Sequence, residues 1–205
     1  MGSDLIRLRS MLVNAFAAFV CFFFAGIQFI HFYSSGHSIR ISHILLAIQQ
    51  LILGILFVLR APPRKTSWKL WDVTAAFLAY FVVFLFLPRP NGENLLGLFF
   101  QITGVALSIF ALLSLGRSVA LMPANRGIRT QGMYCFVRHP LYASYQILNL
   151  GYVLNNPSLY NVVVAIVGLL SQVLRIYTEE RLLAEDPEYA AYQKLVRWRL
   201  VPFLF

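Results

Sequence analysis

Residues 138–142 read Arg-His-Pro-Leu-Tyr, and they open a stretch with the pattern of a helical hairpin. Apolar residues cover 141–154, the turn-forming Asn155-Asn156-Pro157 follows, and a second apolar run covers 158–177. Pro140 fits the first turn of a helix, because the N–H that proline lacks has no partner there in any case. We therefore expect a helix that begins at about Pro140, a turn, and a longer return helix.

Four more apolar runs precede the hairpin, at residues 11–33, 41–59, 68–87 and 94–115. Each is close to the roughly 20 residues that a helix needs to cross a bilayer. Of the 205 residues, 59% are hydrophobic and 12% are charged, whereas soluble domains carry about 25% charged residues. This balance argues against a soluble enzyme or a disordered chain. It predicts an all-α, polytopic membrane protein with about six transmembrane helices.

The basic residues are distributed unevenly between the two sides of these six runs. Of the 17 Lys and Arg residues, only Arg40 and Arg89 fall on the side opposite to the N-terminus. Such residues concentrate in cytoplasmic segments, so we expect both termini and the loop before Pro140 to be cytoplasmic. The net charge of +9 is then explained by contact with anionic lipid. No basic stretch stands clear of the apolar runs, so we expect no nucleic-acid partner.

The connections between the runs are too short to hold a separate soluble domain. We expect one integrated membrane domain in two parts. Residues 1–116 would form the first four helices, and residues 117–205 a polar loop, the hairpin and a cytoplasmic tail. Within that tail, residues 182–197 have the pattern of an amphipathic helix.

Ionisable residues gather at the start of the first hairpin helix and at the end of the second. Tyr142 lies 13 residues before the turn and Arg175 lies 18 residues after it, or about 20 and 27 Å along a helix. Both therefore reach the same cytoplasmic mouth, where charged groups near the membrane favour a functional site. Arg175 and Glu179 share one helix face, so a plain salt bridge is the alternative.

The same mouth has the chemistry for an anionic ligand. Free backbone N–H groups at the start of the first hairpin helix favour an anion, such as a cofactor carboxylate. Arg175 is a second anchor for a carboxylate or a phosphate. Glu179 and Glu180 can accept hydrogen bonds from a ribose or an amino group.

Three blocks in this region resemble the isoprenylcysteine carboxyl methyltransferase family. Residues 132–142, GMYCFVRHPLY, are similar to its G-x-Y-x-x-x-R-H-P-x-Y signature, and residues 175–183 to its R-x-x-x-E-E segment. The closing block of the family is matched by Tyr189, Tyr192, Val196, Arg197 and Pro202. Two positions depart from the family pattern: Arg126 stands where a histidine is common, and Asp186-Pro187 replaces Phe-Gly.

The resemblance implies an S-adenosylmethionine-dependent methyltransferase that acts on a lipid-like acceptor, in the first place the carboxylate of an isoprenylcysteine-type substrate. Arg175 would address the substrate, and Arg175, Glu179 and Glu180 would form the catalytic group. Either Glu179 or Glu180 could be the glutamate that contacts the cofactor in the family. The cofactor would be held by Arg126, Gly127, Ile128, Arg129, Tyr134, His139, Pro140, Tyr142 and Glu179.

Three alternatives stay open at this stage. A phospholipid N-methyltransferase would share the hairpin and the cofactor, but its amine acceptor would need a base, for which His139 or Glu180 are candidates. An NADPH-dependent sterol-type reductase has a similar hairpin in a longer chain. A non-catalytic membrane scaffold is the third. We expect no metal site, because His31, His37 and His43 have no carboxylate or cysteine beside them.

Overall fold

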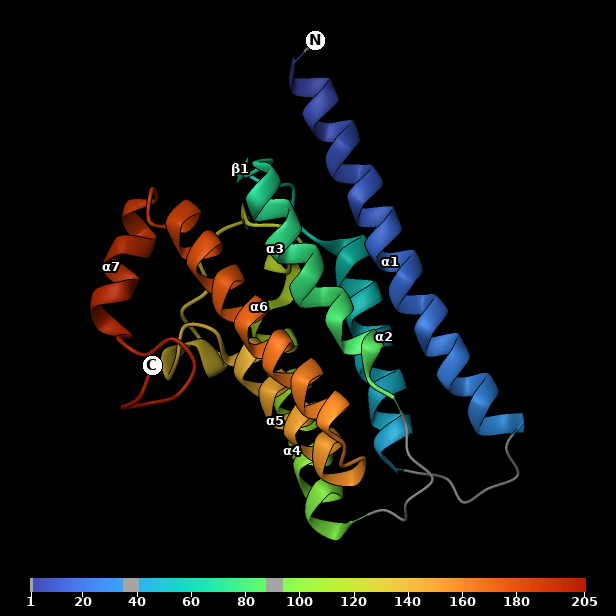
Figure 1. The fold of residues 1–205 in the computed structure, drawn as a ribbon. Helices are drawn as coiled ribbons and strands as arrows, with labels where there is room; N and C mark the ends of the chain where they lie inside the picture. The colour runs from blue at the N-terminus through green and yellow to red at the C-terminus, as the bar shows by residue number, and fades with distance from the viewer. Residues whose placement is uncertain (1, 35–40, 88–93) are drawn as a thin grey trace.

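The computed structural model describes residues 2–34, 41–87 and 94–205, and within these ranges the chain is almost entirely helical (Figure 1). The α-helices are α1 (Gly2–Ser34), α2 (Ile41–Leu59), α3 (Leu70–Phe81), α4 (Leu95–Leu115), α5 (Pro140–Asn155), α6 (Leu159–Leu183) and α7 (Pro187–Leu195). Two short strands, β1 (Lys65–Thr66) and β2 (Ala124–Asn125), pair antiparallel. The expected all-α class is confirmed.

Within the described ranges, two segments are long and apolar enough to cross a membrane, Leu95–Ser118 and Leu159–Leu183. Shorter apolar helices cover Met11–Ile27, Ala47–Leu59 and Leu70–Phe81. Large apolar side chains also point away from the protein along α4 and α6, among them Phe99, Phe110 and Leu170. These faces suit a lipid environment, while six crossings and the cytoplasmic orientation stay predictions.

Two helix ends differ from the expectation. The run at 68–87 contains a helix that ends at Phe81 and continues as a 3-10 helix over Val82–Leu85, where β-branched residues favour helix less. The helix α6 extends beyond 177 to Leu183, and the amphipathic tail helix begins only at Pro187. The break falls there because Asp186 caps α7, accepting a hydrogen bond from Glu188 N at 3.0 Å.

The connections at one end of the helices are joined to one another. In Figure 1 the N-terminus, β1 and α7 lie at one end of the helices, and the turn between α5 and α6 lies at the other. Strand β1 from the α2–α3 connection pairs with β2 from the α4–α5 connection. Ala61 N also donates to Arg117 O at 2.9 Å. The loop before α5 is thus fastened to the first half of the chain.

One buried apolar cluster is shared by both halves of the chain. Phe57 of α2, Leu112 of α4 and Ile176 of α6 are each at most 2% exposed in it. The cluster also includes Ala17 and Cys21 of α1 and Leu200 of the tail. Apolar burial on this scale fixes the helices around the hairpin.

Glycines allow α4 and α5 to pack with their backbones close together. A Cβ on Gly104 would lie 2.5 Å from the backbone N of Leu148, and a Cβ on Gly151 would lie 2.6 Å from Gln101 N. Neither backbone atom can move aside without displacing a helix. Small residues at such crossings are a common basis of helix association in membranes.

We expect Gly104→Ala to destabilise the protein by about 1–3 kcal/mol, because the added methyl group meets backbone and not a flexible side chain. Gly26→Ala is the matched control, since nothing lies within 4 Å of its Cβ position. Thermal unfolding of the purified variants in detergent measures both. Equal melting temperatures for the two variants would contradict the close packing of α4 and α5.

Candidate active site

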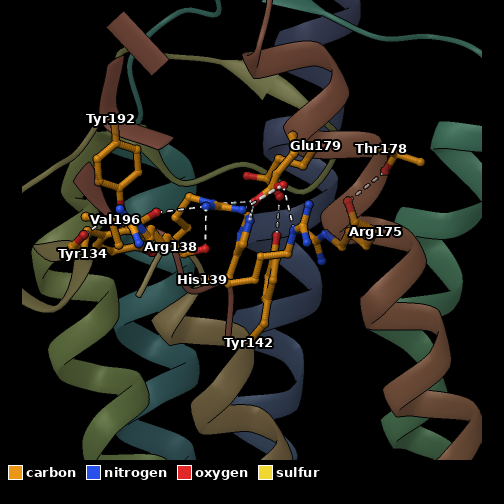
Figure 2. Close-up of polar contacts among 12 residues, drawn as sticks. Tyr134, Arg138, His139, Tyr142, Arg175, Thr178, Glu179, Tyr192 and Val196 are labelled. Carbon is orange, nitrogen blue, oxygen red and sulfur yellow. Dashed lines mark hydrogen bonds and ion pairs between the residues drawn. The ribbon is translucent and has the colours of Figure 1, made fainter. Parts of the chain in front are cut away.

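The first turn of α5 meets the last turns of α6, as the hairpin geometry predicts. Pro140 stands at the first position of α5, and Tyr142 Oη donates to Glu179 Oε2 at 2.6 Å. The ring of His139 stacks on that of Tyr142, with centroids 5.4 Å apart. Figure 2 shows both rings at the start of α5, on the side of Glu179. The structure thus brings the two charged clusters to one mouth.

Glu180 lies at the centre of a buried ionic cluster. Its Oε1 accepts from Arg138 Nε at 2.7 Å and lies 3.1 Å from His139 Nε2. Its Oε2 accepts from Arg199 Nε at 2.9 Å. The carboxylate is therefore occupied by the hairpin on one side and the tail on the other, and it does not line the cavity described below.

Arg138 fastens the C-terminal tail to the hairpin. Its Nη1 donates to the carbonyls of Val196 and Arg197, both at 2.9 Å. The backbone N–H of Arg138 and of His139 donate to the carbonyls of Trp198 and Arg199. The sequence offers no signal for this pairing, because residues 196–199 contribute mainly backbone atoms.

Arg175 is anchored to the loop before α5. Its Nη2 donates to the carbonyls of Ala120 and Leu121, both at 2.9 Å. The guanidinium carbon lies 5.0 Å from the centre of the Tyr142 ring, a cation–π arrangement. Both residues are described in the structure, and Arg175 makes no ion pair with Glu179. The plain helix salt bridge considered above is therefore not formed.

A cavity of about 90 Å³ lies between these groups. Of the nine cofactor residues expected from the resemblance, eight line it: Arg126, Gly127, Ile128, Arg129, Tyr134, His139, Tyr142 and Glu179. Pro140 does not line it and serves to begin α5. The sequence reasoning did not assign Tyr189 and Tyr192 to the site, although their spacing on one face of the tail helix is a signal that could have found them.

Three of the residues that line this cavity each have a buried side-chain polar atom without a hydrogen-bond partner. The atoms are Arg126 Nε, Arg175 Nε and the hydroxyl of Tyr189. A buried polar group without a partner costs about 1–3 kcal/mol, which a polar ligand would relieve. Gly127 has φ +94°, with open space where a Cβ would stand. These features fit a cofactor that carries a carboxylate and a ribose.

The cations at this end of the protein are partly desolvated. Burial lowers the pKa of Arg126 to about 10. Burial, with the charge of Arg126 as a second cause, lowers the pKa of Arg60 to about 9. Two buried guanidinium groups that repel one another favour an anion nearby.

A second, larger cavity of about 370 Å³ adjoins the first and shares Leu53, Tyr80, Tyr145 and Arg175 with it. It lies among the helices, and its mainly apolar lining is interrupted by polar side chains. The side chains of Gln49, Gln50, Gln101, Asn149, Tyr152 and Gln172 contribute to it. Among them, the Oε1 atoms of Gln49, Gln50 and Gln172 are buried without a hydrogen-bond partner.

Within the part of the chain that the structure describes, no three His, Cys, Asp or Glu side chains are grouped to hold a metal ion. That finding does not cover His31, His37 and His43, the three histidines considered in the sequence. His37 and the side chains of His31 and His43 lie outside what the structure describes.

The family described as phospholipid methyltransferase matches residues 93–188 of the chain. This range contains α4, the loop with Arg126, the hairpin and both glutamates. That family is a membrane methyltransferase family related to the isoprenylcysteine carboxyl methyltransferases. No curated protein matches the chain. The match and the apolar helices together support a membrane methyltransferase.

We expect Glu180→Gln to lower the free energy of unfolding by about 3–5 kcal/mol, because it leaves the buried Arg138 and the partly exposed Arg199 without their counter-charge. Glu185→Gln is the control. Its ion pair with Lys65 is more than half exposed, so its loss should cost at most about 1 kcal/mol. Chemical unfolding followed by tryptophan fluorescence compares the two variants. A Glu180→Gln protein as stable as the control would show that the cluster does not hold the tail.

Proposed function

We propose that the protein is an S-adenosylmethionine-dependent methyltransferase whose cofactor binds in the 90 Å³ cavity at the hairpin mouth. The observation that carries this proposal is the convergence of eight expected cofactor residues on one cavity with three unpartnered polar atoms. The match to a methyltransferase family over residues 93–188 favours methyl transfer over the reductase and scaffold alternatives. Cofactor pockets are commonly about 300 Å³ or more, so the cavity would widen when the cofactor binds.

The lining residues suggest how the cofactor would be held. The Nε of Arg126 has no hydrogen-bond partner, and the positive charges of Arg126 and the neighbouring Arg60 would attract the cofactor carboxylate. Glu179 faces the cavity and is held in place by Tyr142, so it suits the ribose hydroxyls or the amino group. Glu180 is already occupied by Arg138, His139 and Arg199. Between the two glutamates, the geometry therefore favours Glu179 as the cofactor contact and Glu180 as a positioning residue.

The reaction that fits best is transfer to a carboxylate of an isoprenylcysteine-type substrate. The bound cofactor supplies an electrophilic methyl group, and a carboxylate attacks it without a general base. The chain then has to position the acceptor and exclude water. Arg175 is suited to this task, because its Nε is free between the two cavities. In this proposal the acceptor arrives from the membrane and the cofactor from the cytoplasm.

Phospholipid N-methylation is the second candidate, and the family match favours it. An ammonium group must lose a proton before it can attack, so this reaction needs a base. Glu180 does not line the cavity, and His139, which does line it, lies 3.1 Å from Glu180 Oε1. Glu179 is the carboxylate that lines the cavity, which makes it the base in this version.

Cofactor binding is tested by calorimetric titration of S-adenosylhomocysteine into the detergent-purified protein. We expect micromolar binding that falls at least about tenfold in Tyr142→Phe and Glu179→Gln, because each loses a charge-assisted hydrogen bond. Tyr160→Phe is a matched control, since Tyr160 is 47% exposed on α6, far along the helix from the cavity. Absence of binding by folded wild-type protein would rule out the proposed cofactor.

Arg175→Gln should abolish methyl transfer to a lipid extract while S-adenosylhomocysteine still binds. The reason is that the substitution removes the charge that would orient the acceptor carboxylate. Arg197→Gln, an exposed arginine in the tail, should leave turnover unchanged. Transfer of label from radioactive S-adenosylmethionine to the extract measures both. Turnover that survives in Arg175→Gln would contradict the role given to Arg175.

A further inference from the structure

The two positions at which the chain departs from the family pattern lie beside each other in the structure. Arg126 stands in the loop before α5, and Asp186 directly precedes α7. Asn125, the neighbour of Arg126, donates from Nδ2 to Asp186 Oδ2 at 2.7 Å. This hydrogen bond joins the turn between α6 and α7 to the loop that carries Arg126 and Gly127. The resemblance assigns no role to Asn125 or to Asp186.

The two carboxylate oxygens of Asp186 have separate tasks. Oδ1 accepts from Glu188 N at 3.0 Å and so caps α7. Oδ2 accepts from Asn125 and lies 3.9 Å from a nitrogen of Arg64, whose side chain is 67% exposed. A solvated ion pair at that distance contributes little. The hydrogen bond from Asn125 is therefore the main interaction of Oδ2.

The amide of Asn125 satisfies both of its neighbours in one orientation only. Its Oδ1 accepts from the backbone N of Gly127 at 3.0 Å, while its Nδ2 donates to Asp186. A carboxylate only accepts and a backbone N–H only donates, so a flipped amide would present the wrong group to each of them. Asn125 is 7% exposed, so water does not readily replace either hydrogen bond. Asp186 thus determines which way the amide points.

Gly127 is the residue through which these hydrogen bonds reach the cavity. Gly127 and Arg126 line the 90 Å³ cavity, whereas Asn125 and Asp186 do not. The φ of Gly127 is +94°, a value that glycine reaches without strain but about as readily as a negative one. The backbone therefore needs an outside contact to select this conformation, and Asn125 Oδ1 provides it.

We propose that Asp186 is a positioning residue of the cofactor site. Its carboxylate orients the Asn125 amide, and the amide holds Gly127 and the adjoining Arg126 in the shape that binds the cofactor. Neither Asp186 nor Asn125 touches the cofactor, so both act through the backbone of Gly127. This role rests on the function proposed above and deepens it, because it states what sets the affinity for the cofactor.

An exchange of the two side chains tests this role. In Asp186→Asn, either an NH₂ group faces the NH₂ group of Asn125 or the cap of α7 is lost. In Asn125→Asp, two carboxylates face each other. The double variant Asn125→Asp/Asp186→Asn can make all three hydrogen bonds again, because the donor and the acceptor have only changed places. Its net charge equals that of the wild type.

Calorimetric titration in detergent measures the effect on S-adenosylhomocysteine binding. We expect binding about five- to tenfold weaker in each single variant, and within about twofold of wild type in the double variant. Glu185→Gln is the matched control. It removes a carboxylate from the same turn, but its ion pair with Lys65 is exposed, so the affinity should stay within about twofold. A double variant that binds as weakly as the single variants would overturn the proposal, as would single variants that bind like wild type.

Amide hydrogen exchange of the ligand-free protein separates this role from the proposed function. The peptide that contains Gly127 should exchange at least about fivefold faster in both single variants, and at the wild-type rate in the double variant and in Glu185→Gln. That pattern without S-adenosylhomocysteine binding would contradict the methyltransferase proposal and leave Asp186 as the residue that fixes the loop. S-adenosylhomocysteine binding with unchanged exchange in the single variants would overturn the role of Asp186 and leave the methyltransferase proposal standing.

Discussion

A single buried carboxylate organises the end of the protein where the site lies. Glu180 balances Arg138 on the hairpin and Arg199 on the tail, and it contacts His139 between them. Without that charge, the buried Arg138 and the partly exposed Arg199 would have no counter-charge between them and would repel each other. The tail would then lose its ionic attachment to the hairpin and would be held by hydrogen bonds such as those that the backbone N–H groups of Arg138 and His139 donate. This electrostatic balance therefore helps to hold Tyr189 and Tyr192 of the tail at the cavity.

The same cluster explains why two adjacent glutamates have different environments. Successive residues on a helix point about 100° apart, so Glu180 faces the tail and Glu179 faces the open space beside Tyr142. One carboxylate is used for structure and the other stays available for a ligand. The two tasks require each other, because Tyr142 and His139, which frame the cavity, stand on the turn that Glu180 fixes.

Much of this arrangement could be predicted from the sequence. Pro140 fixes the start of α5, and the lengths of the two hairpin arms bring Tyr142 and Arg175 to the same level. What could not be predicted depends on contacts between distant segments. The pairing of Arg138 with the carbonyls of Val196 and Arg197 is one case, since a backbone carbonyl has no sequence signature. The free Nε of Arg175 is another, because its Nη2 is taken by carbonyls 54 and 55 residues away.

The loop that carries Arg126 and Gly127 is held from outside the segment that bears the motifs. Arg126 donates to the carbonyl of Ala61, β2 pairs with β1, and Asn125 donates to Asp186 at 2.7 Å. The residues that carry the family signature are therefore not a self-contained module. A fragment limited to them would keep every motif residue and lose the strand that shapes the loop. Grafting the hairpin onto another set of helices would likewise require a replacement for residues 61–66.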